Sequence, residues 1–518
     1  MTSRLSRRDF LKWMTLGAAA LAARPLASHL DPSTGSGHRL GRDSSAPNVF
    51  VFVFDAWCAD HLSIHGYPRD TMPNLARFAE RAFVYHNHIA SGSFTVPGTA
   101  SLLTGLHPWA HRAVQLTAGG VTRAHKDHNA FAAFSQNYNT MGYTQNPYAD
   151  IFLYQFEKYL HTYIPESAFN LESRMLSSLP IFNNDAQMAF ASIENNILRN
   201  GKGTSGSLYL GMGARLDGLS KYAKTRRAYI GEYPAGVPIA SGVFLLDELV
   251  NGLGAAIREI KAPTFSYFHV YPPHEPYAPR SEFARLFEDG WTFPEKPVHP
   301  LSLTLYPREE ALANRQRYDQ YLAAWDAEFG RLLEEMKSSG QLETSIIVLT
   351  SDHGELFERG EIGHNSFLLS SPIVHVPLFI SLPGQMERKD FYEFTSAVDV
   401  MPTLTNLVGL EAPAWADGRL LPGLGGEEDP NRSVFSLDAK TASSFAAFKQ
   451  YSISITRQRH RLIRYQYSNY EGFEFYNLDD DPEELKNLFP SNPSLAADMK
   501  GELDQTVADF NRPYEKKN

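Results

Sequence analysis

The run from Val49 to Phe54 constrains the fold of this chain more than any other feature of its sequence. Valine and phenylalanine alternate along it, so a strand formed here is apolar on both faces. Strands of this kind belong to parallel sheets that are covered by helices on two sides. The run ends abruptly at Asp55, at the edge of such a sheet where α/β proteins bind their ligands. The sequence therefore predicts an α/β fold built around this strand.

Two other apolar runs have the same character and also end in polar residues. Residues 264–270 are followed by His274, and residues 345–350 are followed by Asp352 and His353. Amphipathic helical patterns lie between the runs, as is typical of a doubly wound sheet with helices on both faces. Because the carboxyl ends of parallel strands share one edge, we expect the polar residues that follow them to meet there.

The composition of the 518 residues is that of a globular protein, with 43% hydrophobic and 20% charged residues. A chain of this length has room for a large domain and a smaller one. The net charge of −10, with no basic cluster beyond the extreme N-terminus, argues against a nucleic-acid partner. Cys58 is the single cysteine, which excludes an intramolecular disulfide.

The N-terminus has the pattern of an export signal. Residues 4–12 are basic and contain Ser-Arg-Arg-Asp-Phe-Leu-Lys, and the uncharged stretch that follows is too short to span a membrane. The motif resembles the twin-arginine signal, which implies export of the folded protein by the twin-arginine translocase to the periplasm or the extracellular space. An uncleaved amphipathic anchor is the alternative. We expect a signal peptide over 1–28, a linker over 29–46, and no transmembrane segment in the mature chain.

The remaining chain is predicted to divide into two parts. Residues 47–429 form the α/β domain, with an insertion at about 150–230 where the α/β rhythm breaks, and residues 430–518 form a small α+β subdomain. Alternation with period two is typical of antiparallel strands in this last part. Three strands and a final helix are predicted there, over 451–456, 461–467, 473–478 and 493–510.

Asp55, Asp352 and His353 carry the first chemical signal. Two carboxylates and an imidazole from separate strand ends form a mixed oxygen and nitrogen set that suits a divalent cation. Each residue alone has an ordinary alternative, because an aspartate after a strand is often a helix cap or a turn residue.

Thr95 carries the second signal. It precedes a proline at the start of a helical pattern that closes with Gly105. At a helix N-terminus the free N–H groups and the helix dipole favour an anion. The alternative is a threonine that only caps the helix.

These segments, in this order, resemble the sulfatase-like branch of the alkaline phosphatase superfamily. The resemblance spans about residues 47–490, with a gap over the insertion, and implies a doubly wound mixed sheet with flanking helices and a small C-terminal subdomain. Its further landmarks are the segments 65–75, 93–105, 271–277, 349–355, 375–378, 398–404 and 475–488.

The resemblance implies a role for each matching residue. Asp55, Asp352 and His353 would bind a metal ion, and Thr95 would be the nucleophile and also contact the metal. One divalent ion is favoured over two, since no Asp-x-x-x-His stands at a suitable place between Thr95 and Asp352. Zn²⁺, Mn²⁺ and Ca²⁺ suit these ligands about equally.

Two histidines match substrate positions of the family. His274 would contact the transferred group, and His364 stands where sulfatases usually place a substrate lysine. For both, a purely structural role is the alternative; for His274 this is a loop histidine held by its neighbouring prolines.

One departure from the family decides the expected reaction. Sulfatases need a cysteine or serine that is converted to formylglycine, with an arginine four residues on, whereas this chain has Thr95 and Thr99. Cys58 lacks the surrounding motif. The threonine resembles the phosphoryl-transfer members, which implies hydrolysis of a phosphate ester through a phosphothreonine intermediate. The alternatives are a phosphoglycerol- or phosphoethanolamine-type transferase, a sulfuric ester hydrolase with another nucleophile, and an inactive binding protein on the same fold.

The start of the expected insertion is rich in aromatic residues. These side chains either line a pocket for a small-molecule, lipid-linked or glycan-linked ester or form a local core. They are Tyr148, Phe152, Tyr154, Phe156, Tyr159, Tyr163 and Phe169.

Overall fold

The computed structural model describes residues 46–116, 119–171, 208–240, 242–260, 263–491 and 494–515. They belong to one compact unit, residues 43–518. The predicted signal peptide, nearly all of the linker and the centre of the expected insertion (172–207) lie outside the described residues. Within the described part of the chain, no helix is long and apolar enough to cross a membrane.

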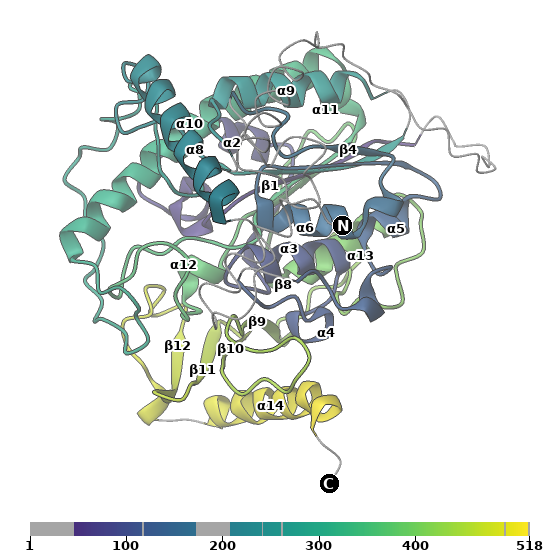
Figure 1. The fold of residues 1–518 in the computed structure, drawn as a ribbon. Coiled ribbons are helices and arrows are strands. Elements are labelled where there is room, and N and C mark those ends of the chain that lie inside the picture. Colours follow the sequence, from purple (N-terminus) through teal and green to yellow (C-terminus); the bar gives the residue numbers. More distant parts are fainter. Residues whose placement is uncertain are drawn as a thin grey trace, which may run out of the picture. The chain divides into compact units, whose positions relative to one another are not determined.

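An eight-stranded sheet forms the centre of the molecule (Figure 1). Its strand order is β4-β3-β5-β1-β6-β7-β2-β8. The strand β7 runs antiparallel to both of its neighbours, whereas the other pairs are parallel, so the sheet is mixed. The strands are β1 Val49–Phe54, β2 Phe83–Ile89, β3 Asn139–Thr144, β4 Thr162–Ile164, β5 Thr264–Val270, β6 Ile346–Thr350, β7 Leu378–Ser381 and β8 Lys389–Ser396. The predicted fold class is confirmed.

Helices cover both faces of the sheet, which explains why its central strands are apolar throughout. Figure 1 shows α2, α9 and α10 on one side and α3, α5, α6 and α13 on the other. The α-helices of this part are α2 Pro73–Ala79, α3 Thr95–Thr104, α4 Pro108–His111, α5 Ala130–Phe134, α6 Pro147–Gln155, α8 Leu208–Tyr229, α9 Leu246–Arg258, α10 Arg308–Ser338, α11 Gln341–Thr344, α12 Ser371–Val374 and α13 Val400–Leu407.

The central strand β1 lies between β5 and β6, and its alternation supplies two separate cores. Its phenylalanines pack with the side chains of α9 and α10, where the Phe54 ring meets Trp325 edge-on at 5.2 Å. Its valines pack on the other face with side chains of α3, α5 and α13. Because β1 is fixed from both sides, the residue that follows it, Asp55, is held at a defined place on the edge of the sheet.

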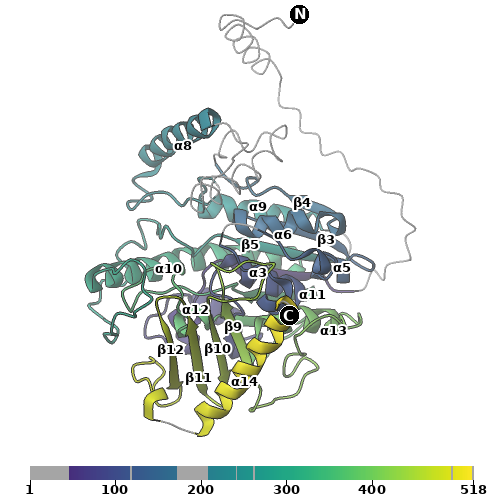
Figure 2. The same ribbon diagram turned by 60° about the horizontal axis from the view of Figure 1, so that its bottom comes forward.

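The C-terminal part contains a four-stranded antiparallel sheet with the order β12-β11-β10-β9. Figure 2 shows α14 lying across one face of this sheet. The three predicted strands and the last helix are present within about two residues of their expected bounds, and β9 is an additional strand that the pattern did not predict. These elements are β9 Val434–Asp438, β10 Tyr451–Arg457, β11 His460–Gln466, β12 Glu471–Asn477 and α14 Ser494–Asn511.

Residues 147–164, expected to begin the insertion, instead continue the α/β alternation. The helix α6 follows β3, and β4 then pairs in parallel with β3 at the edge of the main sheet. Of the aromatic residues here, Phe152 and Phe156 are fully buried in the core, whereas Tyr154 is 51% exposed. This burial favours the local-core interpretation of these side chains over a pocket wall.

Candidate functional site

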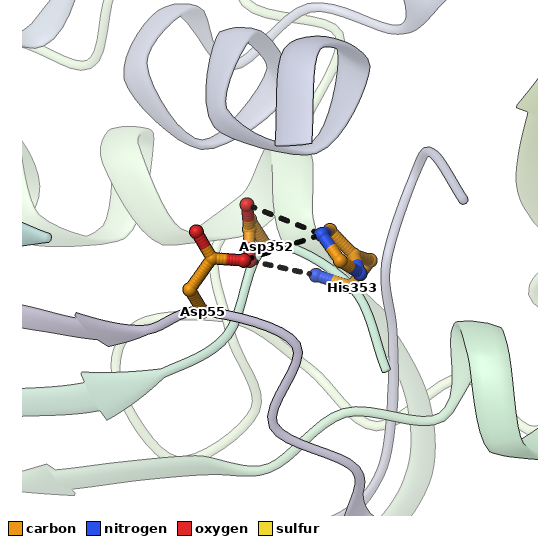
Figure 3. Close-up of side chains that lie close together, drawn as sticks. All are labelled: Asp55, Asp352 and His353. Atoms are coloured by element: carbon orange, nitrogen blue, oxygen red, sulfur yellow. Dashed lines mark hydrogen bonds and ion pairs between the residues drawn. The ribbon is translucent and has the colours of Figure 1, made fainter. Parts of the chain in front are cut away.

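Three of the residues singled out from the sequence meet at the carboxyl edge of the main sheet (Figure 3). Asp55 follows β1, and Asp352 and His353 follow β6, the strand beside it. One ligating atom from each lies within 4.8 Å of the others, and all three side chains are fully buried. The Nε2 atom of His353 is 3.4 Å from Asp55 Oδ1 and 3.7 Å from Asp352 Oδ2.

The electrostatics of this cluster suit a bound cation. Burial and the nearby charge of Asp55 raise the pKa of Asp352. Burial would also raise the pKa of Asp55, but His274, His269 and His353 together hold that pKa well below its usual value. Two desolvated carboxylates repel each other unless a positive charge lies between them. Among the described residues no hydrogen-bond donor pairs with Asp55 Oδ1, which leaves this buried oxygen free to bind a metal ion.

Thr95 is the first residue of α3 and is buried beside the cluster. Its Oγ1 atom lies 3.4 Å from His353 Nε2, and the first N–H groups of a helix have no partner within the helix. The structure thus places the predicted nucleophile next to the predicted metal ligands, at a helix end whose dipole favours an anion.

The position of Thr95 depends on how closely α3 approaches the segment after β6. Gly98, one turn into the helix, lies over the backbone of Asp352, and a Cβ atom at this position would be 2.1 Å from the Asp352 carbonyl oxygen. Only glycine allows this contact, so Gly98 sets the distance between Thr95 and the carboxylate cluster.

Asn146 belongs to the site, although it was not predicted from the sequence. Its Oδ1 atom caps α6 by accepting the N–H of Tyr148 at 2.8 Å, which fixes the orientation of the amide. The amide nitrogen then donates to Asp55 Oδ2 at 2.6 Å and to Thr95 Oγ1 at 3.2 Å. The signal in the sequence was an Asn-Pro pair after a strand, β3, that we had not recognised.

His269 also belongs to the site and was not predicted. It lies within β5, fully buried, with its Nε2 atom 3.2 Å from Asp55 Oδ2 and 3.7 Å from Asp352 Oδ2. The other polar residues of the cluster follow strands, whereas His269 faces it from inside one. A histidine within an otherwise apolar strand was the available signal.

The two predicted substrate histidines lie side by side next to the cluster. The rings of His274 and His364 are 4.7 Å apart, and the His364 ring is 4.3 Å from that of His353. Burial and the neighbouring His353 lower the pKa of His364 well below its usual value. Burial likewise lowers the pKa of His274, with His364 adding to the effect against the opposing charge of Asp55. The surroundings of both imidazoles therefore disfavour their charged form.

Glu355 holds His364 in place. Its Oε1 atom is 2.9 Å from His364 Nδ1, and burial raises the pKa of the carboxyl to about 7. The pair is inside the protein, where His364 is only 6% exposed. Hydrogen bonding through Nδ1 leaves the opposite ring nitrogen, Nε2, available to a substrate.

The C-terminal sheet reaches the site through the end of β9. Asp438 accepts a hydrogen bond from Ser93 at 2.6 Å, close to Thr95, and forms a buried ion pair with Lys440 at 2.9 Å. The ammonium group of Lys440 also donates to the carbonyl oxygens of Asn365 and Ser366, directly after His364. One buried ion pair thus connects the loop before Thr95 with the loop that carries His364.

Comparison with known proteins agrees with this geometry. A model of the family described as "Sulfatase" matches residues 47–410, and a model described as "N-sulphoglucosamine sulphohydrolase, C-terminal" matches residues 363–509. The chain belongs to the sulfatase family and is a sulfatase-like hydrolase of the alkaline phosphatase superfamily.

Individual relatives show how broad this family is. The chain is 24% identical to the multifunctional alkaline phosphatase superfamily protein PehA of Trinickia caryophylli, over 87% of this chain and 92% of that protein. It is 27% identical to the choline-sulfatase of Rhizobium meliloti, over 47% and 48% of the two chains. Its fold is similar to that of the phosphonate monoester hydrolase of Agrobacterium radiobacter, with a TM-score of 0.63 and 20% identity over 90% and 96% of the chains.

Substitution of Gly98 by alanine tests the close approach of α3. The added methyl group meets the backbone of Asp352, so we expect the free energy of unfolding to fall by about 1–3 kcal/mol. The control is Gly501→Ala in α14, where nothing lies within 4 Å and alanine should stabilise the helix by about 0.5–1 kcal/mol. Urea denaturation measures both, and a Gly98→Ala variant as stable as the wild type contradicts the described contact.

Substitution of Lys440 by methionine tests the buried ion pair between Lys440 and Asp438. It leaves Asp438 buried without its cation, so we expect a loss of about 3–5 kcal/mol in the free energy of unfolding. The exposed Lys486→Met is the control and should change stability by less than about 0.5 kcal/mol. If the pair is real, Asp438→Asn combined with Lys440→Met is less destabilising than the sum of the single changes; additive effects in urea denaturation would show no coupling.

Proposed function

We propose that this protein is a metal-dependent hydrolase of phosphate or phosphonate esters that uses Thr95 as its nucleophile. One observation carries the proposal: a threonine hydroxyl lies at the head of α3, 3.4 Å from His353 and beside two buried carboxylates. A relative described as a multifunctional member of the alkaline phosphatase superfamily and a structural neighbour described as a phosphonate monoester hydrolase support this direction.

The nature of the nucleophile favours phosphorus over sulfur chemistry. Thr95 is a secondary alcohol, which cannot be converted to the formylglycine aldehyde expected of sulfatases. Cys58 does not replace it, because this thiol is fully buried and burial raises its pKa well above the usual value. A thiol held in this form is a poor nucleophile. The unmodified hydroxyl of Thr95 therefore remains the group that attacks.

The residues of the site divide the reaction between them. Asp55, Asp352, His353 and Thr95 would hold a divalent cation, which when bound lowers the pKa of the attacking hydroxyl and screens the phosphate charge. The amide of Asn146 orients Thr95 Oγ1 through a hydrogen bond of 3.2 Å. The Oγ1 atom forms a bond to phosphorus as the bond to the ester oxygen breaks, and water then releases the phosphoryl group from Thr95.

The departing ester oxygen needs a proton, and His364 can supply it together with Glu355. With the Glu355 carboxyl protonated and donating to His364 Nδ1, the ring carries its own proton on Nε2; as Nε2 gives that proton to the ester oxygen, Nδ1 takes the proton of Glu355. His274 lies beside this ring, where it can bind a non-bridging oxygen of the phosphoryl group. Glu355 binds the far nitrogen of His364 and fixes the ring with its other nitrogen available. An uncharged pair of histidines also adds no positive charge to the site. We therefore expect the site to prefer esters with a single negative charge, such as phosphodiesters and phosphonate monoesters, over doubly charged phosphate monoesters.

We also propose that the protein acts outside the cytoplasm, after export of the folded chain. The twin-arginine pattern of residues 4–12 supports this, and the single cysteine agrees with it, because a chain exported in the folded state needs no disulfide formed after export. The expected substrate is an ester reached in the periplasm or beyond the cell.

A substrate panel on purified wild type and variants tests the proposed reaction. The panel consists of a nitrophenyl phosphate monoester, the corresponding phosphate diester, a nitrophenyl phosphonate ester and a nitrophenyl sulfate ester. Each substrate is assayed with Zn²⁺, Mn²⁺ or Ca²⁺. We expect the phosphodiester or the phosphonate ester to dominate. Thr95→Ala should lose at least about three orders of magnitude in kcat, since it removes the nucleophile. Mass spectrometry of rapidly quenched reactions should find the phosphoryl group on Thr95.

The matched control is Thr104→Ala, a threonine of the same helix whose hydroxyl bonds only to backbone groups near its end. This variant should keep wild-type turnover. Dominant turnover of the sulfate ester, or full activity in Thr95→Ala, would refute the proposed chemistry.

A further inference from the structure

His269 is the one imidazole that faces the carboxylate cluster from inside the sheet. It is fully buried in β5, in register with Val53 of β1, so its backbone is fixed by a ladder on each side. Its Nε2 atom is 3.2 Å from Asp55 Oδ2 and 3.7 Å from Asp352 Oδ2, yet within the described part of the chain this nitrogen makes no hydrogen bond.

The other ring nitrogen of His269 is held by a neighbour in the same strand. Its Nδ1 atom lies 3.3 Å from the hydroxyl oxygen of Tyr267, two residues earlier in β5. His353 is held in the same way, with its Nδ1 atom 2.9 Å from the carbonyl oxygen of Gly354.

A ring held through Nδ1 presents Nε2 to the carboxylates, and both His269 and His353 are arranged in this way. Two buried carboxylates that lie side by side repel each other unless a cation lies between them.

We propose that His269 is a ligand of the metal ion, so that the site binds its cation through two imidazoles and two carboxylates. The inference rests on the metal dependence in the proposed function. The distances from His269 to the carboxylate oxygens, 3.2 and 3.7 Å, match those from His353 to the same two residues, 3.4 and 3.7 Å. The bond from Nδ1 to Tyr267 is the kind of outer contact that fixes the tautomer and direction of a metal-bound histidine.

A second nitrogen ligand changes the metal that the site prefers. Ca²⁺ takes oxygen ligands, whereas Zn²⁺, Mn²⁺ and other transition ions accept imidazole. Asp55, Asp352 and His353 alone fit these ions about equally; the addition of His269 favours a transition ion such as Zn²⁺ and disfavours Ca²⁺.

The test counts the imidazole ligands and measures metal binding without any substrate. Wild type and His269→Ala are depleted of metal, loaded with one equivalent of Zn²⁺ and examined by X-ray absorption at the zinc edge. We expect the variant to have one imidazole fewer per ion. We also expect its Zn²⁺ affinity, measured by chelator competition, to fall by at least about 100-fold, while Ca²⁺ affinity changes little.

Two further variants separate a ligand from a structural histidine. Tyr267→Phe keeps His269 but removes its Nδ1 partner and should lower Zn²⁺ affinity by about 10–100-fold. His88→Ala removes another fully buried histidine, whose Nδ1 atom bonds to Thr395 in the edge strand β8. This variant should leave Zn²⁺ affinity unchanged. If His269→Ala does not fold, the Tyr267→Phe result decides.

An unchanged imidazole count in His269→Ala would overturn the inference. So would a higher Zn²⁺ affinity in that variant, because it would mean that His269 competes with the metal for the carboxylates. Neither result depends on turnover. Dominant sulfate hydrolysis would refute the proposed function and leave the ligand count standing, whereas an unchanged count would leave phosphoester hydrolysis standing.

Discussion

The juxtaposition of two fully buried carboxylates, Asp55 and Asp352, is the interaction on which the rest of the site depends. Taking a carboxylate out of water is unfavourable by several kcal/mol even after local relaxation. The protein sustains two of them at the ends of adjacent strands, β1 and β6, because both strands are held by cores on each face. Neighbouring polar groups act on these charges: Asn146 donates to one, Thr99 to the other, and His353 lies between them.

The groups of the site that do not follow strands need contacts of their own to hold them in place. Thr95 comes from a helix end, and His274 and His364 come from loops. Gly98 brings the helix into contact with the segment after β6, and Glu355 holds the His364 ring through its Nδ1 atom. The strands thus provide the fixed charges, and a few specific contacts bring the groups that would handle the substrate to them.

The sequence predicted the parts of this structure that are encoded locally. The apolar run 49–54 predicted the central strand because burial on both faces leaves a local pattern, and the residues directly after such strands gave Asp55, Asp352 and His353. His269, Asn146 and Lys440 were missed because their roles come from register and from distant segments. His269 faces the cluster only because β5 pairs with β1 in one particular register, which a single strand does not reveal. Residues 147–164 were assigned to the insertion because their many aromatic residues obscured the patterns of the helix α6 and the edge strand β4.

The ion pair between Asp438 and Lys440 has a consequence for the order in which the site is made. A ribosome delivers the chain from its N-terminus, and domains fold as their residues emerge. Asp55, Thr95, Asp352 and His353 are all synthesised before β9, so a nascent chain carries these residues of the site while the loops around Thr95 and His364 still lack their common anchor. The loops around Thr95 and His364 are therefore joined only when the last strands have been made.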